Sequence, residues 1–152
     1  MGLEVRYYIQ SDAAAFRDLN VAWITAHFTM DAKDREVLEN PGAMVIGRGG
    51  RILIAEEDGA AVGTLALIPV QPGQVELCKM AVSPGLRGKG IGRALLEAAD
   101  DAARNMGATS IWLEANKVLD AAISLYRSCG YAELTDDAPA YDPGSTQFVK
   151  TL

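Results

Sequence analysis

The most informative stretch of this chain is residues 82–93, which read VSPGLRGKGIGR. Glycine occupies every second position from Gly88 to Gly92, directly before a long stretch with helical periodicity. Glycines let the backbone come close to a ligand, and the start of a helix offers N–H groups with a partial positive charge. The run from Lys79 to Arg93 also holds four basic residues and no acid, although the whole chain has a formal net charge of −6. The segment therefore predicts a site for an anion such as phosphate, where a strand gives way to a helix.

Two nucleotide-binding motifs do not fit this segment. The dinucleotide motif Gly-x-Gly-x-x-Gly, counted from Gly88, puts Arg93 where the third glycine belongs. The P-loop motif needs Ser or Thr after its Gly-Lys pair, where this chain has Gly90. It also needs a glycine at the position of Ser83. Both interpretations fail on the residues themselves, so the anion belongs to another class of ligand.

Length and composition narrow the class of protein. The 152 residues suffice for one compact domain, and we expect a single domain over residues 1–152. The acidic balance argues against nucleic acid or an anionic membrane as partner, because such proteins need a basic face. We expect a cytoplasmic protein, since the sequence shows neither a membrane-length apolar run nor an export signal. Two cysteines and one histidine do not form the usual metal-binding patterns, so no metal is expected.

Periodicity and turn signals predict alternating strands and helices. Asp58-Gly59 is a strong hairpin signal between two strands, and Asn40-Pro41-Gly42 is expected to end a helix. The expected strands cover residues 4–9, 51–57, 61–70, 74–82, 109–114, 131–134 and 146–152. The first expected helix follows Ser11-Asp12. Three more are expected from Asp31 to Leu38, from Gly90 to Met106, and from Leu119 to Cys129. Because hairpins pair antiparallel and helical crossovers pair parallel, this order predicts an α/β protein with a mixed sheet.

Three motifs occur in a fixed order along the chain. Residues 87–92 fit Arg-x-x-Gly-x-Gly, residues 113–116 read LEAN, and residues 125–131 read LYRSCGY. Together they resemble the GCN5-related N-acetyltransferase (GNAT) superfamily, and the resemblance covers essentially the whole chain. It implies an α/β fold with a mixed, mostly antiparallel sheet of about six to seven strands and about four flanking helices. In that fold the cofactor-binding strand splays away from its neighbour.

The resemblance also implies acetyl-CoA as cosubstrate. The glycine segment then holds the pyrophosphate through backbone amides and basic side chains, and its residues are Arg87, Gly88, Lys89, Gly90, Ile91, Gly92 and Arg93. The preceding strand binds the pantetheine arm and the acetyl carbonyl through the backbone of Met80, Ala81 and Val82. Asn116 contacts the pantetheine arm, and Tyr126 lies near the coenzyme sulfur.

The implied reaction is acetyl transfer to a primary amine by direct attack in a ternary complex. At neutral pH an amine with a pKa near 10.4 is only about one part in 2,500 neutral, which withholds about 4–5 kcal/mol of reactivity. A base must therefore take the proton. The resemblance implies Glu76 as that base and Tyr126 as the acid that protonates the departing thiolate. Strand alternation predicts that Glu76, Cys78 and Met80 share one face, with Lys79 on the other.

Each of these residues has a structural alternative. Glu76 is otherwise a solvated strand residue, Tyr126 a core residue of its helix, and Asn116 a helix cap. Cys78 is expected to be a small buried residue rather than a nucleophile, because no histidine lies in the neighbouring blocks to activate it. His27 is expected to be partly buried on the apolar face of the first helix.

A second class of function also fits the motifs, namely a non-catalytic acyl-CoA sensor or interaction module on the same fold. The acceptor stays open between a small-molecule amine and an amine on a protein, because one fold serves many acceptors. An acidic surface would attract cationic acceptors such as polyamines, aminoglycosides or exposed lysines. Dimers are common in the family, which leaves a homodimer open as well.

Overall fold

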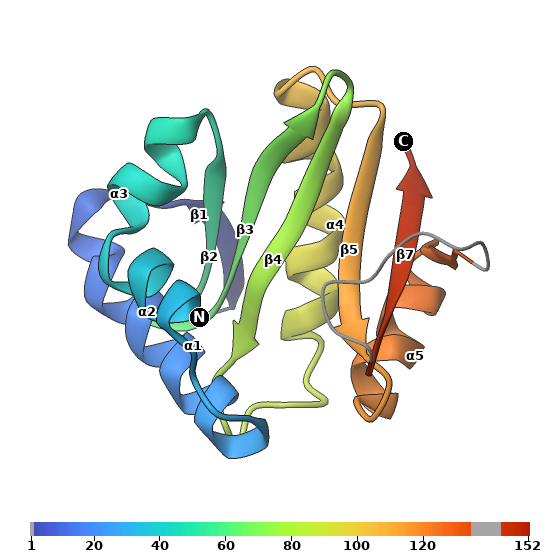
Figure 1. Cartoon of the computed structure of the whole chain (residues 1–152). Helices are drawn as coiled ribbons and strands as arrows, with labels where there is room; N and C mark the ends of the chain where they lie inside the picture. Colours follow the sequence, from blue (N-terminus) through green and yellow to red (C-terminus); the bar gives the residue numbers. More distant parts are fainter. Residues whose placement is uncertain (1, 135–143) are drawn as a thin grey trace.

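The computed structural model describes residues 2–134 and 144–152, and these form one seven-stranded sheet with helices on both faces (Figure 1). The elements are β1 (Leu3–Tyr7), α1 (Ala13–His27), α2 (Ala32–Glu39), α3 (Pro41–Met44), β2 (Arg51–Glu57), β3 (Ala60–Gln71), β4 (Gln74–Val82), α4 (Ile91–Asn105), β5 (Ser110–Asn116), α5 (Asp120–Ser128), β6 (Ala132–Glu133) and β7 (Ser145–Thr151). The strand order is β1-β2-β3-β4-β5-β7-β6, and every pair is antiparallel except β4 with β5. The predicted mixed, mostly antiparallel sheet is confirmed.

The hairpin between β2 and β3 has the turn that its sequence predicts. Asp58 and Gly59 both take positive φ angles, 51° and 83°. A two-residue turn of this kind needs two positive φ angles and matches the twist of the flanking strands, which explains the Asp-Gly pair.

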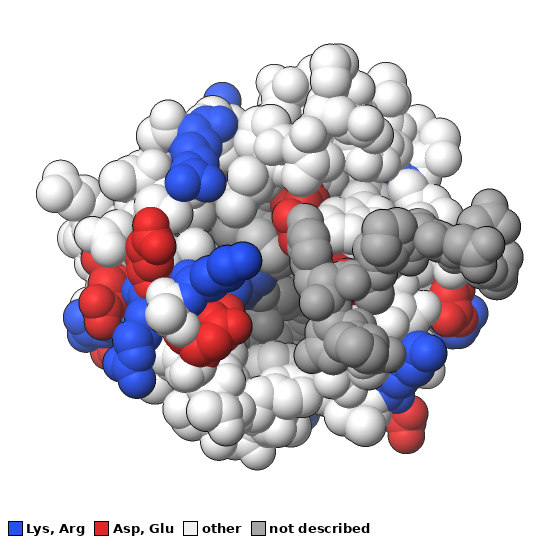
Figure 2. All heavy atoms as spheres, in the orientation of Figure 1, with Lys and Arg blue, Asp and Glu red and all other residues white. Residues whose placement is uncertain are grey.

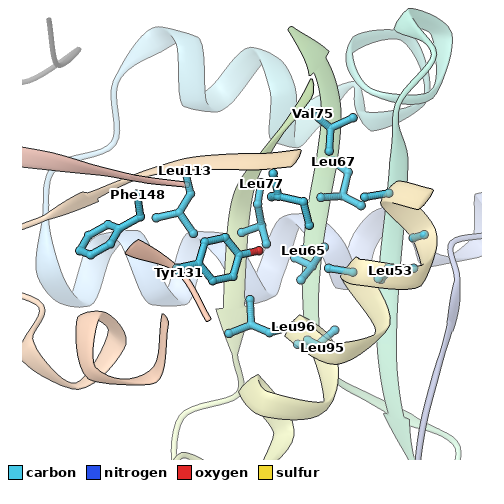
Figure 3. Packing of buried hydrophobic residues seen from close by; sticks show 14 of the residues in the cluster. Leu53, Leu65, Leu67, Val75, Leu77, Leu95, Leu96, Leu113, Tyr131 and Phe148 are labelled. Atoms are coloured by element: carbon cyan, nitrogen blue, oxygen red, sulfur yellow. The ribbon is translucent and has the colours of Figure 1, made fainter. Parts of the chain in front are cut away.

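Two apolar clusters hold the helices to the sheet. On one face α4 packs on β2, β3 and β4, with Leu95 and Leu96 buried against Leu53, Leu65 and Leu77 (Figure 3). On the other face, α1 to α3 pack on the sheet through a second cluster that contains Phe16, Leu38, Val45, Ile52 and Ile54. Each such side chain contributes about 1.5–3 kcal/mol to folding when fully buried. The helical stripe predicted for residues 90–106 is therefore confirmed as the main contact of α4.

Strand β4 departs from regular pairing with β3. The register shifts between Cys78 and Ala81, which places a β-bulge at the two residues between them, and Lys79 takes a φ of 52°. A bulge interrupts the alternation of side chains along a strand. As a result, Cys78 packs with the α1-side cluster, Met80 packs with the α4-side cluster, and Lys79 reaches α2. The predicted common face of Glu76, Cys78 and Met80 is therefore wrong at Met80, as is the placement of Lys79 on the opposite face.

On its other edge, β4 pairs with β5 over three residue pairs only. The pairs run from Gln74↔Ser110 to Glu76↔Trp112, after which the two described strands separate. The splayed strand is therefore confirmed. Its backbone groups after Glu76 face a gap in the sheet instead of a neighbouring strand.

The structure has one helix more than expected. Pro41 follows the end of α2, but it starts the short helix α3 instead of a loop, because proline fits the first turn of a helix. Residues 2–134 and 144–152 thus hold five α-helices, against about four expected. Within the described ranges, no helix combines the length and apolar character needed to cross a membrane.

Candidate functional site

Two cavities lie where β4 and β5 separate. The main cleft has a volume of about 800 Å³ and is lined by the end of β4, the glycine segment and α5. The side cavity has a volume of about 360 Å³ and lies between α1, the start of α2, β4 and β5. The gap in the sheet therefore joins a large cleft to a smaller cavity.

The start of α4 lines the main cleft. Gly88 and Gly90 take left-handed φ angles of 80° and 84°, and Gly90 is the residue before the helix. The N–H groups of the first helical residues, Ile91, Gly92 and Arg93, have no acceptor within the helix. All three residues line the cleft. This geometry is the one predicted for an anion site.

Gly92 lies where three elements meet closely at the wall of the cleft. A Cβ atom at this position would lie 2.9 Å from Cδ2 of Leu125 and 3.4 Å from Cε of Met80. The absence of a side chain therefore allows α4, α5 and β4 to meet closely at the cleft wall.

The three basic residues of the segment are placed differently. Arg87 lines the main cleft, whereas Lys89 is exposed and is not part of its wall. Arg93 lines the cleft and also donates to Oγ of Ser128 at 2.9 Å and to Sγ of Cys129 at 3.6 Å. Arg93 thus ties the start of α4 to the end of α5, a contact that the sequence did not reveal.

The splayed part of β4 forms another wall of the main cleft. Met80, Ala81 and Val82 all line it, as the sequence analysis requires of the three backbone positions. Ala81 and Val82 pair with β3 on one edge, but β5 does not pair with this part of β4, so the main-chain groups on the β5 edge can bond to a ligand in the cleft.

The side cavity is lined by charged and aromatic residues. Lys79 donates from Nζ to Oδ1 of Asp34 at 2.7 Å, and Asp31, Glu114 and Trp23 also line the cavity. Burial alone raises the pKa of Asp34, but the bonds to Lys79 and Asp31 together outweigh burial and lower that pKa. In Figure 2, acidic and basic side chains gather over the α1–α2 side of this face, beside a hollow. Across residues 2–134 and 144–152, no group of three or more ligating side chains is arranged to hold a metal.

Four residues line both cavities and mark their junction. They are Trp23, Met80, Leu119 and Tyr126. The Tyr126 ring packs edge-on against Tyr131, with 6.0 Å between the ring centroids. Burial raises the pKa of Tyr126 to about 12, so its hydroxyl stays protonated near neutral pH and can donate a hydrogen bond.

Two carboxylates lie on the side-cavity face of the sheet. Glu76 stands opposite Trp112, and Glu114 follows two residues along β5, so both side chains leave the sheet on one face. Burial raises the pKa of Glu76, and the Glu114 charge raises it further against the opposing effect of Lys79. Glu114 lines the side cavity, whereas Glu76 lies beside it without forming its wall. Sequence reasoning missed Glu114, although it belongs to the LEAN motif.

The remaining predicted residues take defined places. Asn116 ends β5, lines the side cavity, and accepts through Oδ1 from the N–H of Val118 at 3.0 Å. Burial raises the pKa of Cys78 to about 12, so the thiol stays protonated, in line with a packing role. The expectation of a partly buried His27 is wrong, because His27, at the end of α1, is exposed. His27 instead lines the main cleft, with its ring 4.9 Å from that of Trp23.

Curated relatives with named activities match parts of the chain. An IAA acetyltransferase of Azospirillum brasilense is 39% identical over 104 residues, which cover 67% of this chain and 68% of that protein. A streptothricin acetyltransferase of Streptomyces lavendulae is 48% identical over 60 residues, which cover 40% of this chain and 32% of that protein. The matched part thus spans from about a third to about two thirds of these two relatives.

Solved structures share the fold along almost the entire chain. A GNAT-family acetyltransferase from Staphylococcus aureus has a TM-score of 0.86 at 21% identity and covers 99% of both chains. The protein yncA from Salmonella typhimurium, solved with its cofactor acetyl-CoA, has a TM-score of 0.80 at 23% identity. That comparison covers 99% of this chain and 94% of the other. At these identities the likeness establishes the fold.

A family assignment comes from the sequence itself. Residues 13–131 match the Acetyltransferase (GNAT) family, which is well over half of the chain. The matched range contains α4 with its glycine segment, the splayed strand β4, and Tyr126 at the junction of the two cavities. The chain therefore belongs to the GNAT family of acetyltransferases.

Proposed function

We propose that this protein is an N-acetyltransferase that moves an acetyl group from acetyl-CoA to a primary amine by direct attack. The observation that carries the proposal is the junction of the main cleft and the side cavity at Trp23, Met80, Leu119 and Tyr126. Direct transfer requires two reactants to meet at one point in a fixed geometry. A cleft with an anion site and a cavity with acidic walls, meeting at a hydroxyl donor, fit that requirement.

The main cleft would hold acetyl-CoA. The amides at residues 91–93 and the Arg87 guanidinium would bind the pyrophosphate, because a helix start favours negative charge. The backbone from Met80 to Val82, which has no β5 partner on that edge, would bind the pantetheine arm and the acetyl carbonyl. The relatives solved with acetyl-CoA and with coenzyme A support this choice of cosubstrate.

The side cavity would receive the amine and remove its proton. Glu114 lies on the cavity wall, and Glu76 lies beside it with a raised pKa, so Glu76 binds a proton more readily than a free carboxylate does. We assign the final acceptance of the proton to Glu76, by way of Glu114 or a water molecule. As the new N–C bond forms and the C–S bond breaks, the Tyr126 hydroxyl donates to the departing sulfur.

The first experiment separates binding from turnover. Acetyl-CoA should raise the melting temperature of the protein, and a panel of primary amines should identify one that releases free coenzyme thiol. Thermal stabilisation without thiol release from any amine would contradict the catalytic proposal and indicate the acyl-CoA-binding module instead.

The second experiment tests the base. Glu76→Gln should lower kcat by about 10²- to 10⁴-fold, the usual contribution of a general base. Glu97→Gln is the matched control, because Glu97 is an exposed acid on α4 outside both cavities. If Glu114→Gln lowers kcat in this way and Glu76→Gln does not, the base is Glu114 and the assignment to Glu76 fails.

A further inference from the structure

The side cavity contains an ion pair that joins two distant elements. Lys79 of β4 and Asp34 of α2 are 2.7 Å apart, and their side chains are only 21% and 22% exposed. The second Asp34 oxygen accepts from the N–H of Asp31 at 3.4 Å, and the Asp34 N–H donates to Oδ1 of Asp31 at 2.8 Å. Asp34 is thus fixed between an ammonium group and the first turn of α2, on the cavity wall.

Lys79 reaches this position because of the bulge in β4. Its φ of 52° is uncommon for a residue with a side chain, and regular alternation would have turned it away from α2. The surrounding structure must hold such a conformation in place. The bond to Asp34 does so, which indicates that the ammonium group has a specific place in this cavity.

The charges on the described wall of the cavity do not balance. One ammonium group, that of Lys79, stands against three carboxylates, and these belong to Asp31, Asp34 and Glu114. The formal sum at neutral pH is one positive charge against three negative charges, or −2. Charges in a partly buried cavity interact more strongly than charges in bulk water. The cavity therefore favours a cationic ligand.

The reaction itself removes one positive charge from the acceptor. The attacking amine must be neutral, so an acceptor with a single amine brings no positive charge to the acidic wall at the moment of attack. An acceptor with a second cationic group keeps a positive charge throughout the reaction. The rings of Trp23 and Phe28, which also line the cavity, can attract such a group through their π faces.

We propose that the acceptor carries a second cationic group besides its reacting amine, and that the Lys79–Asp34 ion pair sets this charge selectivity. The proposal rests on the proposed acetyltransferase function and names its substrate class. Lys79 neutralises one carboxylate and limits the positive charge that the cavity accepts. Losing either partner therefore shifts the selectivity, and the two losses shift it in opposite directions.

The test compares three series of acceptors that match in chain length and differ only at the far end. They are n-alkylamines, α,ω-diaminoalkanes and ω-aminoalkanoates, which present a methyl, an ammonium and a carboxylate group. For the unmodified protein, kcat/KM for the best diamine should exceed that for the matched alkylamine by about tenfold or more, with the aminoalkanoate lowest. Equal values for diamine and alkylamine would overturn the proposal while leaving the acetyltransferase function in place.

Two variants test the ion pair. Lys79→Met leaves Asp34 without its cation and should raise the diamine-to-alkylamine ratio by about tenfold. Asp34→Asn leaves Lys79 without its anion and should lower that ratio by about tenfold, while raising the activity with aminoalkanoates. Lys79→Arg keeps the charge and should retain the ratio of the unmodified protein.

Matched controls separate selectivity from folding. Lys33→Met and Glu36→Gln make the same changes of net charge on exposed positions of α2 outside the cavity, and they should leave the ratio unchanged. The stabilisation by acetyl-CoA should persist in all variants. A uniform loss of activity with all three acceptor series in both Lys79→Met and Asp34→Asn would show a purely structural role and overturn the proposal. Absence of thiol release from every amine with the unmodified protein would instead refute the acetyltransferase function.

Discussion

Replacing Tyr126 by phenylalanine removes one hydroxyl from the junction of the two cavities and leaves the ring in place. The ring lies 6.0 Å from that of Tyr131 and 6.2 Å from that of Phe148, contacts that phenylalanine preserves. The free energy of unfolding should therefore change by less than about 1 kcal/mol. Any larger effect on the reaction then belongs to the hydroxyl.

The size of that effect follows from the pKa of Tyr126. Burial raises it to about 12, whereas an alkyl thiol has a pKa of about 8.5. Complete transfer of the proton to a free thiolate would therefore climb about 3.5 pKa units, or about 5 kcal/mol. Tyr126 acts better as a hydrogen-bond donor while negative charge builds on the sulfur. A hydrogen bond to a charged group contributes about 1.5–3 kcal/mol, so Tyr126→Phe should lower kcat by about 10- to 150-fold.

The assay measures thiol release at saturating acetyl-CoA with the best amine of the panel, together with the melting temperature. Tyr131→Phe is the matched control, because its hydroxyl is buried, lines neither cavity, and has no hydrogen-bond partner among the described residues. It should leave kcat within about twofold of the unmodified protein. The reasoning is refuted if Tyr126→Phe retains full kcat, or if Tyr131→Phe loses as much.

Three further perturbations address the cleft, the acid stability and the thiol. Gly92→Ala places a Cβ atom 2.9 Å from Leu125, so calorimetry should show that acetyl-CoA binds about tenfold more weakly. The free energy of unfolding should change by only about 1 kcal/mol, because alanine favours the helix. The bond to Arg6 lowers the pKa of Asp12 below the pKa that it has in the unfolded chain. The Asp12 carboxylate therefore stabilises the fold fully at pH values above the unfolded pKa, and this stabilisation disappears as the pH falls through the folded pKa. Urea unfolding of Asp12→Asn should therefore depend less on pH in the acid range than that of the unmodified protein, and equal slopes would contradict this. With a pKa of about 12, Cys78 is about 10⁻⁴ thiolate at pH 8, so iodoacetamide should label it only after unfolding, as peptide mass spectrometry would show.

The parts of the site that local chemistry determines could be predicted from the sequence. Gly88 and Gly90 adopt the left-handed angles that their place before a helix suggests, and Asp58-Gly59 forms the expected tight turn. The apolar stripe of α4 follows from helical periodicity alone and lies on the sheet as expected. The splay of β4 followed from the resemblance of the motifs rather than from any single residue.

The parts that depend on long-range register could not be predicted. Lys79 faces α2 because the pairing of β4 with β3 requires a bulge, and no local signal in the sequence marks that position. Glu114 was overlooked because its place on the cavity wall depends on where β4 and β5 separate. The exposure of His27 depends on how far α1 extends past its packing partners, which periodicity does not define.

The position of Trp23 has a practical consequence. It is one of two tryptophans in the chain, and its indole borders both the main cleft and the side cavity, whereas Trp112 borders neither. In a Trp112→Phe background, a single tryptophan would thus lie beside both ligands. Titrating the two ligands in either sequence, and following the emission, would reveal whether one must arrive before the other.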